Sequence, residues 1–422
     1  MKRIITILIS GLILICICSS SKYTPKTPVT FPEISHPIQI TKNGKEHFYA
    51  SYFGINSFSK NERYATVLET DLKYKLPDNV NEPATLGLVD LKTHDFIPLT
   101  QTRAWNFQQG CMAHWLGISP DSLIIYNDYR NGKSVSVIMN VYTKKEIKVI
   151  PYPVSAVSPD GKMAASINFS RIRITRSDYG YGGGGQDAKA DVQYPSDDGI
   201  FLIDLKTGKA KLIVSVAQVK SMAPEVPQGG IEYFNHTLFS RGGSKLFWLA
   251  RAIPNRNTTA FTVNIDGTNI QRCFPDGWGG SHFDWLNDSD LMITAEYKAK
   301  QYSHIFFTAG KDNYERLGNG LLDFDAHGTF SPDGKWMVTD AYPSPELQEQ
   351  KIYLLNMKSQ AALCLGRFAE PDEFTKDGTS GTDHGKFWRC DLHCRWSPKG
   401  DIIGFNSTMT GSRQAYIFKL QF

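Results

Sequence analysis

The sequence predicts an all-β protein folded as a seven-bladed β-propeller, and three observations support this. One stretch occurs four times, beginning at His236, His282, His327 and His393; each histidine precedes a Phe or Trp by three residues, and a tight turn and an apolar run follow. Repeats at a spacing of several tens of residues, built from short strands and turns, are typical of propeller blades. No later stretch has the period of a long amphipathic helix. Six or eight blades are the alternative counts.

The first residues predict export rather than a part of the fold. Lys2 and Arg3 precede an apolar run from residue 4 to residue 17, which is the pattern of a signal peptide covering residues 1–18. Cys18 and the three serines after it resemble the end of a bacterial lipoprotein signal, although Ile17 stands where that signal prefers a small side chain. Two locations stay open: a lipid anchor at Cys18, as in an outer-membrane lipoprotein, or a cleaved signal and a periplasmic or extracellular chain.

The remaining chain divides into a linker and one domain. Residues 19–35 are polar and contain proline, as expected of a linker, and residues 36–422 form a single predicted propeller. An apolar strand at 37–41 precedes a hairpin turn at Asn43-Gly44 and a strand at 47–51. Three units follow, with strand and turn patterns near 52–94, 118–145 and 157–208, and the four histidine copies begin the last four. Because the chain ends too early for a fourth strand in the last unit, strand 37–41 is predicted to complete it and close the ring.

Composition limits the classes of partner. A net charge of +4 over 422 residues is too small and too scattered for a nucleic-acid-binding protein. Five cysteines remain outside the signal, an odd number without the spacing of a disulfide framework. We expect a monomer whose only membrane contact is the anchor at Cys18.

The four repeated histidines are candidate metal ligands. Alternation along the innermost strand points each imidazole into the channel and the Phe or Trp between blades. Imidazoles suit zinc or manganese, so His236, His282, His327 and His393 form the predicted ligand pool. Cys390 and Cys394 are also suitable ligands, but alternation places them on the opposite face from His393. The structural alternative is a column of channel histidines bonded to water, Asp325 and Asp391, carboxylates that could also orient the imidazoles of a metal site.

Two further segments carry a family resemblance. Together with the histidine repeats, residues 108–117, which include His114, and residues 176–182, which include Tyr179 and Tyr181, resemble the seven-bladed propeller polysaccharide lyases. The likeness is to the ulvan lyases and, less closely, the oligogalacturonate lyases; the blade pattern itself is shared with TolB-like propellers that have no lyase activity. The resemblance implies that His114 and Tyr179 transfer protons, with Tyr181 as the competing choice. The alternative is that His114 only packs beside Trp115.

The resemblance leaves the carboxylate-binding group open. A uronate lyase must neutralise the carboxylate, remove the adjacent proton and protonate the leaving oxygen. Ulvan lyases are expected to carry an arginine soon after the tyrosine, but here only Lys189 follows it within residues 180–205. Arg171, Arg173 and Arg176 precede the tyrosine. Arg173, Arg176 and Lys189 are therefore the candidate carboxylate-binding residues.

The sequence thus predicts an exported lyase that cleaves an acidic, uronic-acid-containing polysaccharide or oligosaccharide by β-elimination. Trp105, Trp278 and Trp388 are candidates for stacking on sugar rings. The alternative is a non-catalytic TolB-like propeller that binds a glycan or a protein partner in the cell envelope. A peptidase is disfavoured because no Gly-x-Ser-x-Gly motif occurs.

Overall fold

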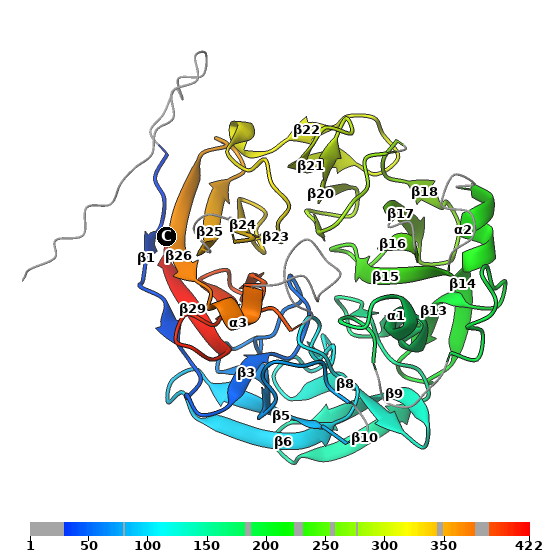
Figure 1. The fold of residues 1–422 in the computed structure, drawn as a ribbon, viewed down its shortest axis with the longest axis horizontal. Coiled ribbons are helices and arrows are strands. Elements are labelled where there is room, and N and C mark those ends of the chain that lie inside the picture. Colours follow the sequence, from blue (N-terminus) through cyan, green and yellow to red (C-terminus); the bar gives the residue numbers. More distant parts are fainter. Residues whose placement is uncertain are drawn as a thin grey trace, which may run out of the picture.

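Seven antiparallel sheets are arranged as blades around a central channel (Figure 1). The computed structural model describes residues 29–78, 81–181, 187–222, 231–253, 258–275, 277–343, 349–375 and 388–422. The predicted all-β, seven-bladed architecture is confirmed. The predicted signal peptide, including Cys18, lies outside the described residues.

Each blade is built from consecutive strands. The first contains β3 (Glu46–Tyr49), β4 (Tyr64–Thr70), β5 (Ala84–Asp90) and β6 (Phe96–Thr102). The second contains β7 (His114–Trp115), β8 (Leu123–Arg130), β9 (Lys133–Asn140) and β10 (Lys145–Ile150). The third contains β11 (Ala156–Val157), β12 (Met163–Ser166), β13 (Gly199–Asp204) and β14 (Ala210–Ser215).

The later blades repeat this order. The fourth contains β15 (Ile231–Phe239), β16 (Lys245–Ile253), β17 (Thr258–Asn264) and β18 (Gln271–Arg272). The fifth contains β19 (Phe283–Trp285), β20 (Asp290–Tyr297), β21 (Gln301–Thr308) and β22 (Glu315–Arg316). The sixth contains β23 (Gly328–Phe330), β24 (Trp336–Ala341), β25 (Glu349–Asn356) and β26 (Ala362–Ala369). The seventh contains β27 (Arg395–Trp396), β28 (Ile402–Ser407) and β29 (Gln414–Gln421).

The N-terminal strands close the ring. β2 (Ile38–Gln39) pairs with β29, as predicted for the strand at 37–41. β1 (Glu33–Ile34) also pairs with β29, although the sequence analysis placed these residues in the linker. The hairpin predicted at Asn43-Gly44 is wrong: the turn is present, but it carries the chain from the seventh blade to the first, so β2 and β3 pair with different sheets. A two-residue turn signal specifies the bend and not the partner of each strand.

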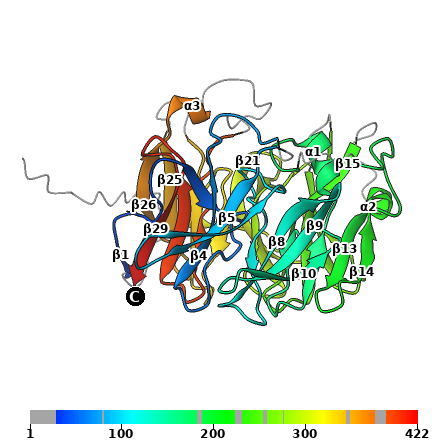
Figure 2. The same ribbon diagram turned by 90° about the horizontal axis from the view of Figure 1, so that it is seen from below.

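Among the described residues, three short helices and one 3₁₀ turn interrupt the strands; sequence patterns did not reveal them, because none is long enough to show a helical period. They are α1 (Phe169–Thr175), α2 (Val216–Met222), α3 (Asp372–Thr375) and η1 (Gly318–Gly320). The Asn168 side chain caps α1 by accepting a hydrogen bond from the Arg171 amide. α1 and α3 lie on one face of the disc, here called the helical face (Figure 2). No helix among the described residues has both the length and the apolar character needed to cross a membrane.

The repeated motif explains the packing between blades. Its aromatic residues are all buried, as predicted: Phe239, Trp285, Phe330 and Trp396. In the turns that follow, Gly161, Gly334 and Gly400 have φ of +69°, +70° and +81°, a left-handed conformation that favours glycine. These turns join the first and second strands of their blades at the end of the disc opposite the helical face, here called the turn face. The cysteines among the described residues are all free, which agrees with the absence of a disulfide pattern.

Candidate active site in the central channel

A loop of the first blade enters the channel and meets the repeated histidines. β3 ends at Tyr49 and Ser51 still bridges Gly110, but pairing with β4 resumes only near Phe58, which bridges Ala65, so residues 52–56 leave the sheet. In this loop Tyr52 stacks on His236 with ring centroids 4.4 Å apart. Its neighbour Phe53 lies 4.9 Å from the His327 ring. His236 and His327 therefore meet this loop in the channel.

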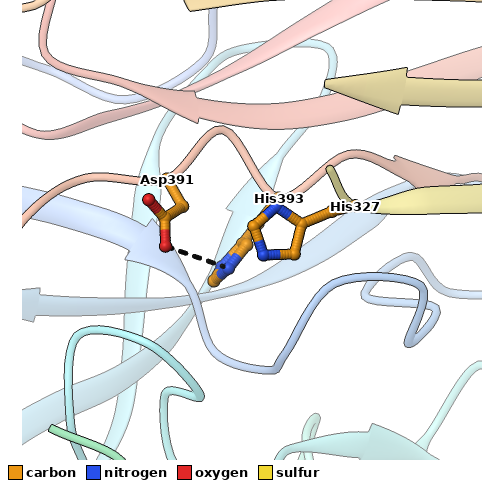
Figure 3. Close-up of side chains that lie close together, drawn as sticks. All are labelled: His327, Asp391 and His393. Carbon is orange, nitrogen blue, oxygen red and sulfur yellow. Dashed lines mark ion pairs between the residues drawn. The ribbon is translucent and has the colours of Figure 1, made fainter. Parts of the chain in front are cut away.

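Three side chains of the sixth and seventh blades converge beside this loop. One nitrogen from each of His327 and His393 and one oxygen of Asp391 lie within 4.8 Å of one another (Figure 3). His393 Nε2 is buried without a hydrogen-bond partner, and the Asp391 carboxylate lies 3.7 Å from it. Two imidazoles and a carboxylate are suitable donors for zinc or manganese, so this cluster fits a divalent cation. Asp391 was expected to orient the imidazoles or to accept their hydrogen bonds, and not to be a ligand itself.

The imidazoles are oriented by carboxylates from neighbouring strands. His327 Nδ1 donates to both oxygens of Asp340, each 3.0 Å away, which directs Nε2 toward the cluster. His282 Nδ1 lies 3.0 Å from Asp325, so this carboxylate serves the histidine of the preceding blade rather than His327. Sequence reasoning missed Asp340, because it lies on the second strand of the sixth blade and is not part of the repeated stretch.

The predicted ligand pool separates into two pairs. His327 and His393 belong to the cluster, whereas His236 and His282 lie outside it. His282 still packs on His327 with ring centroids 3.8 Å apart, and His236 lies beside Tyr179 at 5.2 Å. Burial lowers the pKa of His236, His282 and His393, and the charge of nearby Arg251 lowers that of His236 further. Neutral imidazoles retain a lone pair for a proton or a cation.

Tyr179 is held between two arginines. Its hydroxyl oxygen lies 3.3 Å from Nη2 of Arg389, and the Arg176 guanidinium lies 4.7 Å from its ring centroid. The backbone carbonyl of Tyr179 accepts hydrogen bonds of 2.8 Å from Asn106 and Gln109. The segments that suggested a resemblance therefore meet through Gln109 and not through His114.

Arg389 connects the tyrosine to the metal-binding candidates. It is 3% exposed, and its Nε lies 3.1 Å from Asp391, which also approaches His393. Its Nη1 lies 3.4 Å from Asp178, which pairs at 3.0 Å with Arg176 as well. Burial favours the protonated form of Asp178, but Arg176 and Arg389 together outweigh it and hold the pKa of Asp178 below its usual value. Sequence reasoning missed Arg389, although it precedes the last repeated histidine by four residues.

The other predicted site residues have different surroundings. Tyr181 accepts a hydrogen bond from Asn127 and stacks on Phe169 with centroids 4.4 Å apart, which is a packing role. Arg173 donates to the carbonyl of Ser177, and Lys189 pairs with Asp197. Among the predicted carboxylate-binding residues, the structure brings only Arg176 to Tyr179.

His114 does not meet Tyr179. It lies in β7 and lines a cavity at the turn face, at the opposite end of the channel from the imidazole cluster. Two of the three tryptophans predicted to stack on sugar rings are buried, and that prediction is wrong for them. Trp105 is fully buried and Trp278 is 8% exposed, because both pack among aromatic neighbours. Trp388 is half-buried and adjoins Arg389 in the chain.

Comparison with known proteins supports the fold. No protein-family model and no curated protein sequence matches the chain. The structure is similar to an oligogalacturonate lyase from Vibrio parahaemolyticus, with a TM-score of 0.60, 14% identity, and coverage of 92% of this chain and 98% of that chain. An oligogalacturonate lyase in complex with manganese gives a TM-score of 0.61 and 16% identity, covering 93% of this chain and 98% of that one. A prolyl endopeptidase gives 0.51 at 8% identity, covering 86% of this chain and 45% of that one. At sequence identities this low, the similarity is evidence for the fold alone.

Proposed function

We propose that the chain is a lyase that cleaves uronic-acid-containing oligosaccharides or polysaccharides by β-elimination at the channel site. One observation carries the proposal: Arg389 contacts the Tyr179 hydroxyl and pairs with Asp391 beside His393. A group that binds carboxylates, a group that transfers protons and a candidate cation site are thus joined in one cluster. Elimination next to a carboxylate requires the first two, and a cation assists them. The structural neighbours named as oligogalacturonate lyases support this substrate class.

Arginines supply the binding of the acidic sugar. Arg176, with a side chain 24% exposed, and half-buried Arg251 are the accessible cations near Tyr179 and His236. Arginine binds a carboxylate through two parallel hydrogen bonds, which fixes its orientation as well as its charge. We assign Arg176 and Arg251 to substrate binding and Arg389 to the stabilisation of negative charge that develops beside Tyr179.

Tyr179 and His236 are the proposed proton-transfer pair. Their ring centroids are 5.2 Å apart, and burial keeps the His236 imidazole neutral, so it accepts a proton. Tyr179 carries a hydroxyl proton that it delivers to the leaving glycosidic oxygen. The electrons of the broken carbon–hydrogen bond form the new double bond as the carbon–oxygen bond breaks. In this assignment His236 takes the role that the family resemblance gave to His114.

A divalent cation completes the proposal. His327, His393 and Asp391 would hold it, and it would supply Lewis-acid neutralisation of the uronate carboxylate. Manganese is the first candidate, because one structural neighbour is an oligogalacturonate lyase in complex with manganese, and zinc is the second. Export, a lipid anchor at Cys18 and a monomeric state remain predictions from the sequence.

The test is the absorbance of the conjugated double bond that elimination creates. We expect a rise when the signal-free chain is mixed with oligogalacturonate, with ulvan as the second polymer. Arg389→Lys, which keeps the charge but loses the planar donor pair, should slow the rise about tenfold or more. Arg367→Gln is the control, because this arginine is exposed on the outer strand β26 and pairs with Glu349. No rise on any uronic acid polymer, with binding still measurable, would leave the non-catalytic TolB-like function.

A further inference from the structure

A second cavity opens on the turn face, at the far end of the channel from the imidazole cluster. Its volume is about 490 Å³, within the range of small-molecule sites. Its lining includes Gly54, Ile55 and Asn56, which follow Tyr52 and Phe53 in the channel loop. One loop therefore contacts the histidines with its first residues and the cavity with its next, and separates the two sites.

His114 presents a hydrogen-bond acceptor to this cavity. Its Nδ1 lies 2.7 Å from the carbonyl oxygen of Met112, and since a carbonyl only accepts, Nδ1 carries the proton. Burial lowers the pKa of His114 to about 4, so the ring is neutral at pH 7 and Nε2 has a lone pair. Met112 has φ of 51°, a left-handed conformation that is unfavourable for its side chain and turns its carbonyl toward the ring. No donor among the described residues reaches His114 Nε2.

The ionised groups of the lining carry an excess positive charge. They are Lys60, Arg241 and Asp284, two cations and one anion. Asp284 pairs with Arg241 at 3.1 Å and also accepts 2.7 Å hydrogen bonds from the Thr329 hydroxyl and the Phe330 amide. Within the described part of the chain, the Lys60 ammonium has no carboxylate at ion-pair distance.

Lysines in the equivalent turns of other blades differ from Lys60. Lys162 pairs with Asp160 at 3.3 Å, and Lys335 pairs with Asp333 at 3.1 Å. These pairs neutralise the turns of the third and sixth blades, whereas the charge of Lys60 remains available at the edge of the cavity. An anionic ligand would therefore be attracted to the side on which Lys60 lies.

The remaining wall is rigid and partly apolar. The indole N–H of Trp115 donates to the Ser57 carbonyl and that of Trp396 to the Thr329 carbonyl, which fixes both rings. Prolines of four turns also line the cavity: Pro120, Pro159, Pro332 and Pro398. A sugar-like molecule has both hydroxyl groups and apolar C–H faces, which suits such a wall.

We propose that this cavity is a second binding site, specific for a hydroxy acid of monosaccharide size. The carboxylate lies at Lys60, and a hydroxyl donates to Nε2 of His114. The site is separate from the proposed active site and does not depend on lyase activity. It also gives a role to the one predicted catalytic histidine that the channel site does not use.

The experiment follows the imidazole resonance of His114 by long-range ¹H–¹⁵N NMR, assigned by its absence in His114→Phe. D-Glucuronate is the probe, and uncharged D-glucose is its match. We expect glucuronate to shift the Nε2 resonance in a saturable manner, and Lys60→Gln to weaken binding about tenfold, as for the loss of one charged hydrogen bond. Lys162→Gln is the matched control and should bind as the unchanged chain does.

Two results would overturn the inference. One is the absence of a saturable shift of the His114 resonance with glucuronate, and the other is equal binding by the Lys60→Gln and Lys162→Gln chains. Lys60 is exposed, so its replacement leaves the core intact. Tyr179→Phe should leave this binding unchanged, so loss of binding there would place the ligand in the channel site instead. Failure of the lyase proposal and failure of this inference are therefore distinguishable.

Discussion

Tyr179 and Tyr181 are two residues apart but have different surroundings. The Tyr179 hydroxyl faces Arg389, and the Tyr181 hydroxyl accepts a hydrogen bond from Asn127. Tyr179→Phe removes only the oxygen and keeps the ring between its neighbours. We expect it to lower kcat of the elimination about a hundredfold or more, as for loss of a proton-transfer group. Initial rates of double-bond formation measure this.

Tyr181→Phe is the control for this prediction. It loses one buried hydrogen bond, worth about 1 kcal/mol of stability, while catalysis should stay near that of the unchanged chain. Equal effects of the two substitutions on kcat would remove Tyr179 from the proposed mechanism.

Glu232 should make the stability of the folded chain depend on pH. Its side chain is buried in β15, and its carboxylate oxygens have no hydrogen-bond partner among the described residues. Burial raises its pKa from the ordinary 4.5 to about 7, against the attraction of Lys220 and Arg171. The folded chain therefore binds more protons than the unfolded chain between these values. This favourable contribution is complete below about pH 4.5 and is lost as the pH rises through 7.

Glu232→Gln should remove this dependence. At pH 8 we expect the variant to have a higher free energy of unfolding than the unchanged chain, by up to about 3 kcal/mol, and at pH 5 the difference should be small. Urea unfolding at both pH values measures it. A difference that is the same at both would mean that Glu232 does not titrate in this range.

At the level of single residues, the sequence predicted some positions and not others. The repeat identified His327 and His393, because identical positions in successive blades meet at the channel. Arg389 and Asp340 could not be found this way, because neither belongs to the repeated stretch. His114 lines the turn-face cavity and not the channel site: the sequence shows that it adjoins a strand, but not to which end of the channel its side chain is directed.

At the level of strands, we expect the N-terminal segment that pairs with β29 to stabilise the closed ring. Ile40, which follows β2, is fully buried, and its amide donates to the Ala415 carbonyl of β29. Ile40→Ala should lower the free energy of unfolding by about 2–4 kcal/mol through the cavity it leaves. Ile118→Ala is the matched control, because Ile118 is 58% exposed and should change stability by less than about 0.5 kcal/mol. Similar unfolding midpoints for the two variants in urea would mean that the N-terminal segment does not hold the ring closed.

Most strands, but not β1 or the helix α1, could be located from sequence patterns. Alternation and turns located most strands, and the shortage of strands after residue 402 predicted the closing strand. The position of β1 could not be foreseen, since Glu33 and Ile34 show no alternation and are paired only because β29 extends far enough to meet them. The helix α1 lies between β12 and β13. Its sequence is too short to show a helical period, and the capping residue Asn168 is the feature that marks its start.

A bound cation should increase the stability of the whole molecule. A cation held by His327, His393 and Asp391 joins the sixth and seventh blades, so chelation should lower Tm and Mn²⁺ should restore it. At a concentration 100 times Kd, the gain is about 2.7 kcal/mol. His393→Gln should abolish the response, whereas His36→Gln, at an exposed position, should keep it. A Tm that is insensitive to both chelator and Mn²⁺ would remove the cation from the proposal.

Mass balance is the most direct test of the proposed reaction, because it distinguishes β-elimination at a uronic acid from hydrolysis. Elimination adds no water, so the masses of the two products of one oligogalacturonate should sum to the mass of the substrate. Mass spectrometry of a single defined oligomer, incubated with the unchanged chain and with Tyr179→Phe, gives this sum. We expect two products whose masses together equal the mass of the substrate, and we expect the variant to form them far more slowly. Products whose sum exceeds the substrate by one water would show hydrolysis, and an uncleaved oligomer would show that no cleavage occurs; either result contradicts the lyase proposal.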